Sequence, residues 1–147
     1  MSHPRERSPI ERTLLFIGLA LASRAAAPGL CVQQTVEEAL KSAEIVIEAE
    51  VLDARPGEPS GWARLVVRPG RVWKAGKHLP KVVLSAESPE RPPFVAGQKY
   101  LMFIGRRYDG KLAIGRCSPL TREARLASRE IAELNEGLSS APSRHSP

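Results

Sequence analysis

Short segments of alternating hydrophobicity occupy the middle of the chain and constrain its fold more than any other feature. Residues 44–53 alternate, with Ile45, Ile47 and Val51 on one face of an extended chain and Glu48 on the other. Four further segments rich in β-branched or aromatic residues follow, at 62–74, 81–85, 100–104 and 111–117. The sequence therefore predicts five β-strands.

Helical patterns flank these strands. Thr35 and Glu38 have the spacing of a capping box, which predicts a short helix over 35–43. After the last strand, apolar residues recur at steps of three and four, which predicts an amphipathic helix over 121–137. Its apolar face comprises Leu120, Ala124, Ala127, Ile131, Leu134 and Leu138. A Pro-Gly pair at 69–70 interrupts the second strand and predicts a bulge or corner there.

Five strands with one helix before and one after favour a mainly β fold. We expect a five-stranded OB-like closed barrel with a short N-terminal helix and a C-terminal amphipathic helix, because closure removes exposed sheet edges. The barrel domain is expected over 31–138, followed by a disordered polar tail over 139–147. A hydrophobic content of 42% with 26% charged residues is typical of a globular chain with a packed core.

The beginning of the chain has the pattern of a secretory signal peptide. A polar, arginine-containing start precedes an apolar run over 14–22, and small residues follow at 23–27. The run is too short to span a hydrocarbon core of ~30 Å. We therefore predict a signal peptide over 1–25 and a secreted, periplasmic or cell-envelope protein without a membrane span. Lipid attachment at Cys31 is an alternative, which the bulky Leu30 before it disfavours.

Cys31 and Cys117 both belong to the predicted mature chain. An even cysteine count fits a compartment in which disulfides persist, and two unrelated buried thiols are the alternative. Two cysteines and His78, far apart in sequence, are too few for a zinc site. Nucleophile-elbow, phosphate-loop and HExxH motifs are absent from the sequence. We therefore expect no catalytic residues, no metal and no cofactor, and a protein that is not an enzyme.

Basic and aromatic side chains gather along the second predicted strand and after the fourth. The candidate binding surface consists of Trp62, Arg64, Arg68, Arg71, Trp73, Lys74, Arg106 and Arg107. Such a stripe on an OB barrel is typical of single-stranded nucleic-acid binding, but export argues against that partner. A simple solvated face is the first interpretation, and an anionic polysaccharide or an acidic envelope protein is the best functional one. For Trp73, burial against a helix is the more common role.

Several segments resemble netrin-like domains and tissue inhibitors of metalloproteinases. These are Cys31 with 38–40 and 43–51, the Trp-Lys-x-Gly strand end in 72–76, the aromatic–Gly–Tyr–Leu segment in 94–103, and the closing hairpin 109–117, which ends in a cysteine. They occur in the family's order across 31–117. The resemblance implies an OB barrel flanked by helices, with Cys31 paired to Cys117.

The resemblance lacks one functional element. The family's inhibitors chelate the catalytic zinc of a metalloprotease through an N-terminal Cys-x-Cys, and Gly29 stands where the first of these cysteines would be. The resemblance therefore implies an exported, non-catalytic binding module without the chelating device, with an unknown protein or anionic polysaccharide as partner. The alternatives are an inhibitor of an extracellular metalloendopeptidase and, if the leader is misread, an OB-fold nucleic-acid-binding protein.

Overall fold

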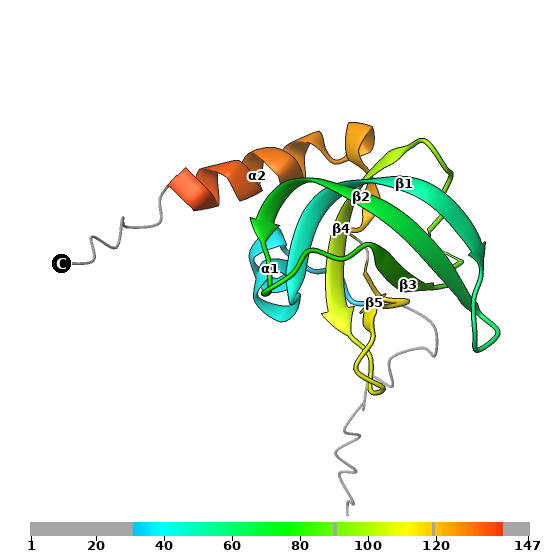
Figure 1. Ribbon diagram of the computed structural model, residues 1–147. Helices are drawn as coiled ribbons and strands as arrows, with labels where there is room; N and C mark the ends of the chain where they lie inside the picture. Colours follow the sequence, from blue (N-terminus) through cyan, green and yellow to red (C-terminus); the bar gives the residue numbers. More distant parts are fainter. Residues whose placement is uncertain (1–30, 90, 119, 140–147) are drawn as a thin grey trace, which may run out of the picture. The chain divides into compact units, whose positions relative to one another are not determined.

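The computed structural model describes residues 31–89, 91–118 and 120–139, and its elements follow the predicted order. The predicted signal peptide, and all of the predicted tail except Ser139, lie outside these residues. The main strands are β1 (Ile45–Pro56), β2 (Trp62–Lys74), β3 (Val82–Ala86), β4 (Lys99–Arg106) and β5 (Leu112–Ile114). Helix α1 (Val36–Ser42) precedes them; strand β6 (Arg122–Glu123), the 3-10 turn η1 (Ala124–Leu126) and helix α2 (Ser128–Ser139) follow (Figure 1).

The five main strands close into a barrel. Their order in the sheet is β1-β2-β3-β5-β4, and β4 pairs back onto β1. The β3–β5 pairing is parallel, whereas the other pairings are antiparallel. The predicted mainly β fold, a five-stranded OB-like closed barrel with a short N-terminal helix and a C-terminal helix, is confirmed.

The predicted interruption of the second strand is a bulge in β2. Ile47 pairs with Val72 and Ala49 pairs with Pro69, so β2 contains one more residue than β1 between these pairs. A Cβ atom on Gly70 would lie 3.3 Å from the backbone oxygen of Glu48. The two strands therefore approach each other closely at the bulge, where glycine leaves the room that a side chain would fill.

The alternation along β1 separates two clusters of buried side chains. Ile45, Ile47 and Val51 point into the barrel, where they pack with residues of β2, β3, β4 and β5. Val46 points outward and packs with Trp73 and with residues of both helices. Strand β1 thus contributes to an inner core and to an outer core that holds the helices against the barrel.

The N-terminal helix begins as its sequence predicts. The backbone N–H of Glu38 donates to Thr35 Oγ1 at 3.2 Å, and the N–H of Thr35 donates to the Glu38 carboxylate at 2.9 Å. This reciprocal capping box satisfies donors that a helix start leaves free.

The C-terminal helix begins seven residues later than predicted, at Ser128 instead of residue 121. Thr121 is buried and its hydroxyl accepts a hydrogen bond from the Phe103 N–H at 2.9 Å, while β6 pairs with β4. Backbone groups of β4 thus find hydrogen-bond partners in the extended segment 121–123. A helix could not supply these partners, so the pairing with β4 overrides the helical periodicity of the sequence. Within α2, Leu134 is buried in the outer core and Ile131 packs against it.

The predicted disulfide is present between Cys31 and Cys117, whose Cα atoms lie 5.1 Å apart. Cys31 precedes α1, and Cys117 follows β5. The bond therefore ties the segment that enters α1 to the segment that leaves the barrel.

Candidate binding site at the open end of the barrel

Trp73 and Lys74 attach the helices to the barrel. The Trp73 side chain is only 7% exposed, and its indole N–H donates to Asn135 Oδ1 of α2 at 2.9 Å. The Lys74 ammonium donates to the carbonyl oxygens of Leu40, at 2.8 Å, and of Lys41 and Ala43, at the end of α1. It therefore caps carbonyls that a helix end leaves free. Neither side chain forms part of an open surface.

Four arginines of the predicted surface lie outside the barrel, and acidic side chains neutralise two of them. Arg68 forms an ion pair with Glu50 at 3.1 Å across β1 and β2. Arg106 pairs with Glu44, and this hydrogen-bonded contact lowers the pKa of the Glu44 carboxyl. Arg71 lies 5.7 Å over the Trp73 ring, and Arg64 is exposed.

Trp62 and Arg107 form a second cation–aromatic pair within the predicted surface, beside that of Arg71 and Trp73. The Arg107 guanidinium lies 4.9 Å from the Trp62 ring centroid and 5.5 Å from that of Tyr108. Its Nε donates to Asp109 Oδ1 at 3.0 Å, and its side chain is only 10% exposed. Hydrogen bonds from Arg107 and from the Lys111 N–H hold the pKa of Asp109 down at about 2. Arg107 is therefore a neutralised, packed part of the β4–β5 hairpin.

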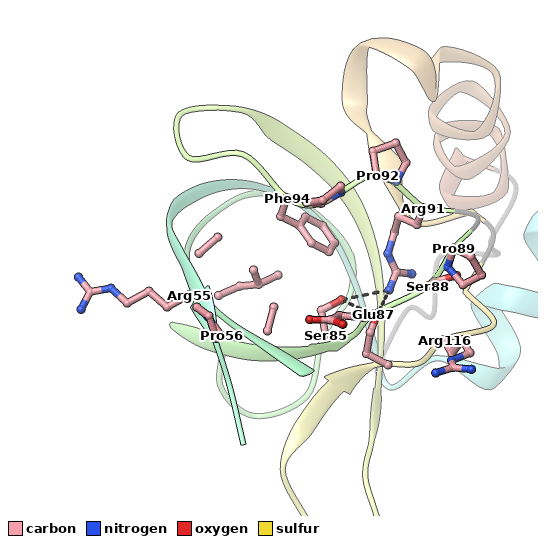
Figure 2. A pocket seen from close by; sticks show the side chains of 15 residues that line it. Arg55, Pro56, Ser85, Glu87, Ser88, Pro89, Arg91, Pro92, Phe94 and Arg116 are labelled. Atoms are coloured by element: carbon pink, nitrogen blue, oxygen red, sulfur yellow. Dashed lines mark hydrogen bonds between the residues drawn. The ribbon is translucent and has the colours of Figure 1, made fainter. Parts of the chain in front are cut away.

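A pocket that the sequence did not predict opens at one end of the barrel (Figure 2). The end of β1, the start of β2, the end of β3 and the loop between β3 and β4 surround it, and its volume is about 810 Å³. Its apolar wall includes Ala54, Ala63, Leu65, Phe94 and several prolines. This volume lies within the range of about 300–1,000 Å³ that is typical of ligand sites.

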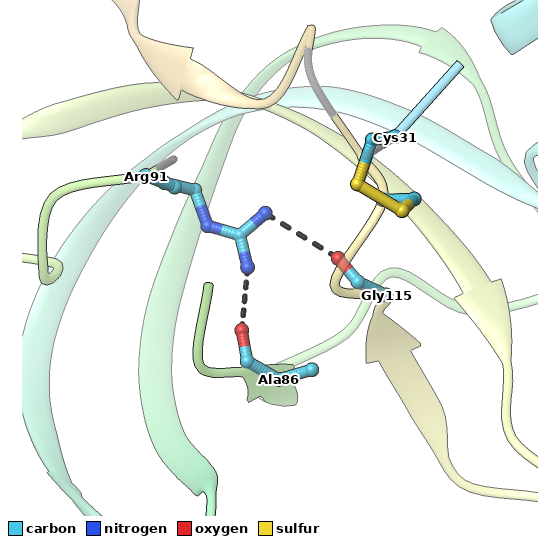
Figure 3. The surroundings of a disulfide bond; sticks show 5 residues. Cys31, Ala86, Arg91 and Gly115 are labelled. Atoms are coloured by element: carbon cyan, nitrogen blue, oxygen red, sulfur yellow. Dashed lines mark hydrogen bonds between the residues drawn. A yellow bond between two sulfur atoms is a disulfide. The ribbon is translucent and has the colours of Figure 1, made fainter. Parts of the chain in front are cut away.

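Arg91 supplies the half-buried cation of this pocket. Its guanidinium donates to the backbone oxygen of Ala86 at 2.6 Å, to Ser85 Oγ at 3.1 Å and, over a longer 3.4 Å, to the backbone oxygen of Gly115 (Figures 2 and 3). It also lies 5.5 Å from the Phe94 ring centroid. Among the described residues, no acidic side chain forms an ion pair with Arg91. Burial lowers the pKa of this guanidinium.

Backbone hydrogen bonds and ring packing fix the loop that carries Arg91. The Val51 N–H of β1 donates to the Gln98 oxygen at 2.9 Å, and the Gly97 N–H donates to the Val51 oxygen at 2.7 Å. The Tyr100 hydroxyl accepts from the Val95 N–H at 2.9 Å, and the Tyr100 ring lies 4.7 Å from that of Phe94. The second half of the proline-rich loop, residues 94–98, is therefore anchored to β1 and β4.

Sequence reasoning missed Arg91 because the segment around it has no strand or helix periodicity. The prolines at 89, 92 and 93 favour irregular structure and indicate nothing about the position of Arg91 in the fold. A useful signal would have been a single cation among prolines between two strongly apolar strands, since such a loop must cross an end of the barrel.

In the part of the chain that the structure describes, no three or more His, Cys, Asp or Glu side chains are grouped so that they could hold a metal ion. No helix among those same residues is both long and apolar enough to cross a membrane. Comparison of the chain with protein-family models and with curated proteins gives no match.

Proposed function

We propose that the chain is an exported, non-catalytic binding module of the netrin-like class, and that it binds its partner in the barrel-end pocket. The observation that carries the proposal is Arg91, a half-buried cation that faces an open pocket and donates to neutral oxygens. A charge removed from water is costly unless an opposite charge compensates it. A partner that brings an anionic group would supply that compensation.

The barrel-end pocket fits this role better than the predicted basic surface does. On the outer face, Arg68 and Arg106 already pair with carboxylates of the protein. An anionic ligand that replaced one of these carboxylates would gain little, because exposed ion pairs contribute little free energy. An anionic polysaccharide would need an extended row of accessible cations. A protein partner with one acidic group needs one prepared cation, which Arg91 provides.

Export is supported by two features. The leader has the pattern of a signal peptide, and the Cys31–Cys117 disulfide fits an oxidising compartment. We therefore propose that the barrel works outside the cytoplasm, either secreted or in the periplasm or cell envelope.

A library of random peptides displayed on phage tests the pocket as the binding site. The exported chain is panned beside two variants, Ala63→Phe, which fills the pocket, and Arg68→Gln, which changes the outer face and leaves the pocket intact. We expect enriched peptides to bind the parent and Arg68→Gln, but not a folded Ala63→Phe protein. Peptides that bind all three proteins equally, or no specific enrichment, would refute the pocket as the site.

We expect the mature protein not to inhibit zinc proteases by chelation. That mechanism needs the α-amine and carbonyl of a terminal cysteine, whereas cleavage after Ala25 would leave five residues ahead of Cys31. Ordering such a tail costs about 1–2 kcal/mol per residue, which offsets the metal bonds gained. A panel of zinc proteases is titrated with the natural form and with a form that begins at Cys31. Tight inhibition by the natural form, abolished by acetylating its amine, would contradict this expectation.

A further inference from the structure

We propose that the barrel-end pocket binds a carboxylate carried next to an apolar group, with Arg91 as the anchor of the carboxylate. The inference rests on the proposed function, because it names the ligand chemistry of the same pocket. The carboxylate could be the C-terminus of a peptide or the side chain of an acidic residue beside an apolar one. The experiment below separates these two sources.

The positive charge and the N–H donors of Arg91 favour a negatively charged ligand group that accepts hydrogen bonds. The guanidinium makes three hydrogen bonds to oxygens of the protein, of which the contact to Gly115 is long. A guanidinium carries five N–H donors. Nη2 already donates to Ser85 and Ala86, so a ligand carboxylate would accept from Nε or Nη1. Because Arg91 is half-buried, its attraction to an anion is screened less than that of a fully solvated arginine.

The walls of the pocket determine what is attached to the carboxylate. Ala54, Ala63 and Leu65 line the pocket from β1 and β2, and Phe94 lines it from the loop. Leu65 also belongs to the inner core, so the pocket continues the apolar interior of the barrel. A branched or aromatic group can therefore be buried there while its carboxylate stays at Arg91. Burial of such a group supplies the apolar part of the affinity.

The other charged residues of the lining are Arg55, Arg116 and Glu87, of which Arg116 is exposed. Arg55 pairs with Asp53 at 2.7 Å, so its charge is largely compensated. Glu87 also lines the pocket and would repel a negative charge on the ligand. Neutralising Arg91 should therefore weaken the binding of an acidic ligand, whereas neutralising Glu87 should strengthen it.

The probes are N-acetyl-L-phenylalanine and its uncharged amide, titrated into the exported full chain by NMR at one salt concentration. We expect the acid to bind about tenfold more tightly than the amide, because a hydrogen bond to a charged group contributes more than one between neutral groups. Chemical-shift changes should centre on Phe94 and Leu65. Equal binding of acid and amide would overturn the proposal.

Four variants assign the preference to individual side chains. Arg91→Met should abolish the difference between acid and amide, and Arg91→Lys should keep a reduced preference, because it retains the charge without the planar guanidinium. Glu87→Gln should strengthen acid binding by up to about twofold, since it removes a repulsion. Arg107→Gln, the matched arginine control, should leave the preference unchanged. If Arg91→Met fails to fold, Arg91→Lys and Glu87→Gln still decide the question.

Two tetrapeptides identify the source of the carboxylate. One ends in phenylalanine with a free carboxyl group, and the other has an internal Glu-Phe pair and an amidated end. Tighter binding of the first supports a C-terminal source, and tighter binding of the second supports a side-chain source. A preference for acid that persists in Arg91→Met, or that is undiminished in Arg91→Lys, would overturn the role of Arg91. If the amide binds as well as the acid and Ala63→Phe abolishes both, the carboxylate inference fails while the pocket remains the binding site.

Discussion

Arg91 and Arg107 both place a guanidinium over aromatic rings, but their surroundings differ in charge. Arg107 lies between Trp62 and Tyr108 and donates to Asp109, which raises the pKa of its guanidinium. Arg91 lies over Phe94 and donates to neutral oxygens, and burial lowers its pKa.

The difference separates a structural arginine from one that can take a ligand. Arg107 is packed in the hairpin, and its acid partner belongs to the same turn. Arg91 is held in place by weaker, neutral acceptors at the edge of an open pocket. The distance of a cation from an aromatic ring is therefore a poor guide to its role, and the charge of its hydrogen-bond partners is a better one.

Removing the disulfide should have the largest effect on the free energy of unfolding. It should also disturb the position of Arg91 more than that of Arg107. The bond closes a loop with a sequence separation of 86. The chain-entropy model gives such a bond about 4–5 kcal/mol. Its loss should also loosen Gly115, two residues before Cys117, which accepts from Arg91 (Figure 3). The double variant Cys31→Ser/Cys117→Ser is compared with the parent by urea unfolding. A loss of stability below about 1 kcal/mol would contradict the prediction.

Leu134→Ala should destabilise the fold without changing the surroundings of Arg91 or Arg107. The Leu134 side chain is 2% exposed in the outer core, and truncating a buried leucine costs about 2–5 kcal/mol. Since the pocket is lined from the inner side of the barrel, the preference for acid over amide should persist in the folded variant. Urea unfolding and the NMR titration measure the two effects. An unchanged stability would indicate that α2 is not docked, and a lost preference would show that the outer core shapes the pocket.

Arg91→Met should affect ligand binding more than stability. Its hydrogen bonds favour the folded state, but Met also relieves the burial of a charge, so the net loss should be about 1 kcal/mol. In the parent, the acid probe at ten times its Kd should raise the free energy of unfolding by about 1.4 kcal/mol. The variant should show almost none of this increase at the same probe concentration. Equal stabilisation of the parent and the variant by the probe would remove Arg91 from the site.

The sequence predicted the barrel but not the pocket, for a physical reason. Alternation along β1 and the capping box at Thr35 are local patterns, and the structure confirms both. The start of α2 depended on a long-range contact, the pairing of β6 with β4, which no local periodicity encodes. Arg91 is a still harder case, because its role depends on Ser85, Ala86 and Gly115 meeting at the end of a closed barrel.

The smallest predicted effect concerns the ion pair that distinguishes Arg107 from Arg91. The pKa of Asp109 lies at about 2 in the folded protein, below its ordinary value of 3.8, so the pair stabilises the fold at neutral pH. This contribution is present above pH 4 and is lost as the pH falls through about 2, when the folded-state carboxylate takes up its proton. Asp109→Asn should therefore lower the Tm slightly at pH 7, and the difference from the parent should shrink steadily between pH 4 and pH 2. Glu37→Gln is the control for an exposed pair elsewhere, on α1. Thermal unfolding at pH 7, 4, 3 and 2 measures the difference, and one that stays constant over this range would mean that Arg107 draws no charge compensation from Asp109.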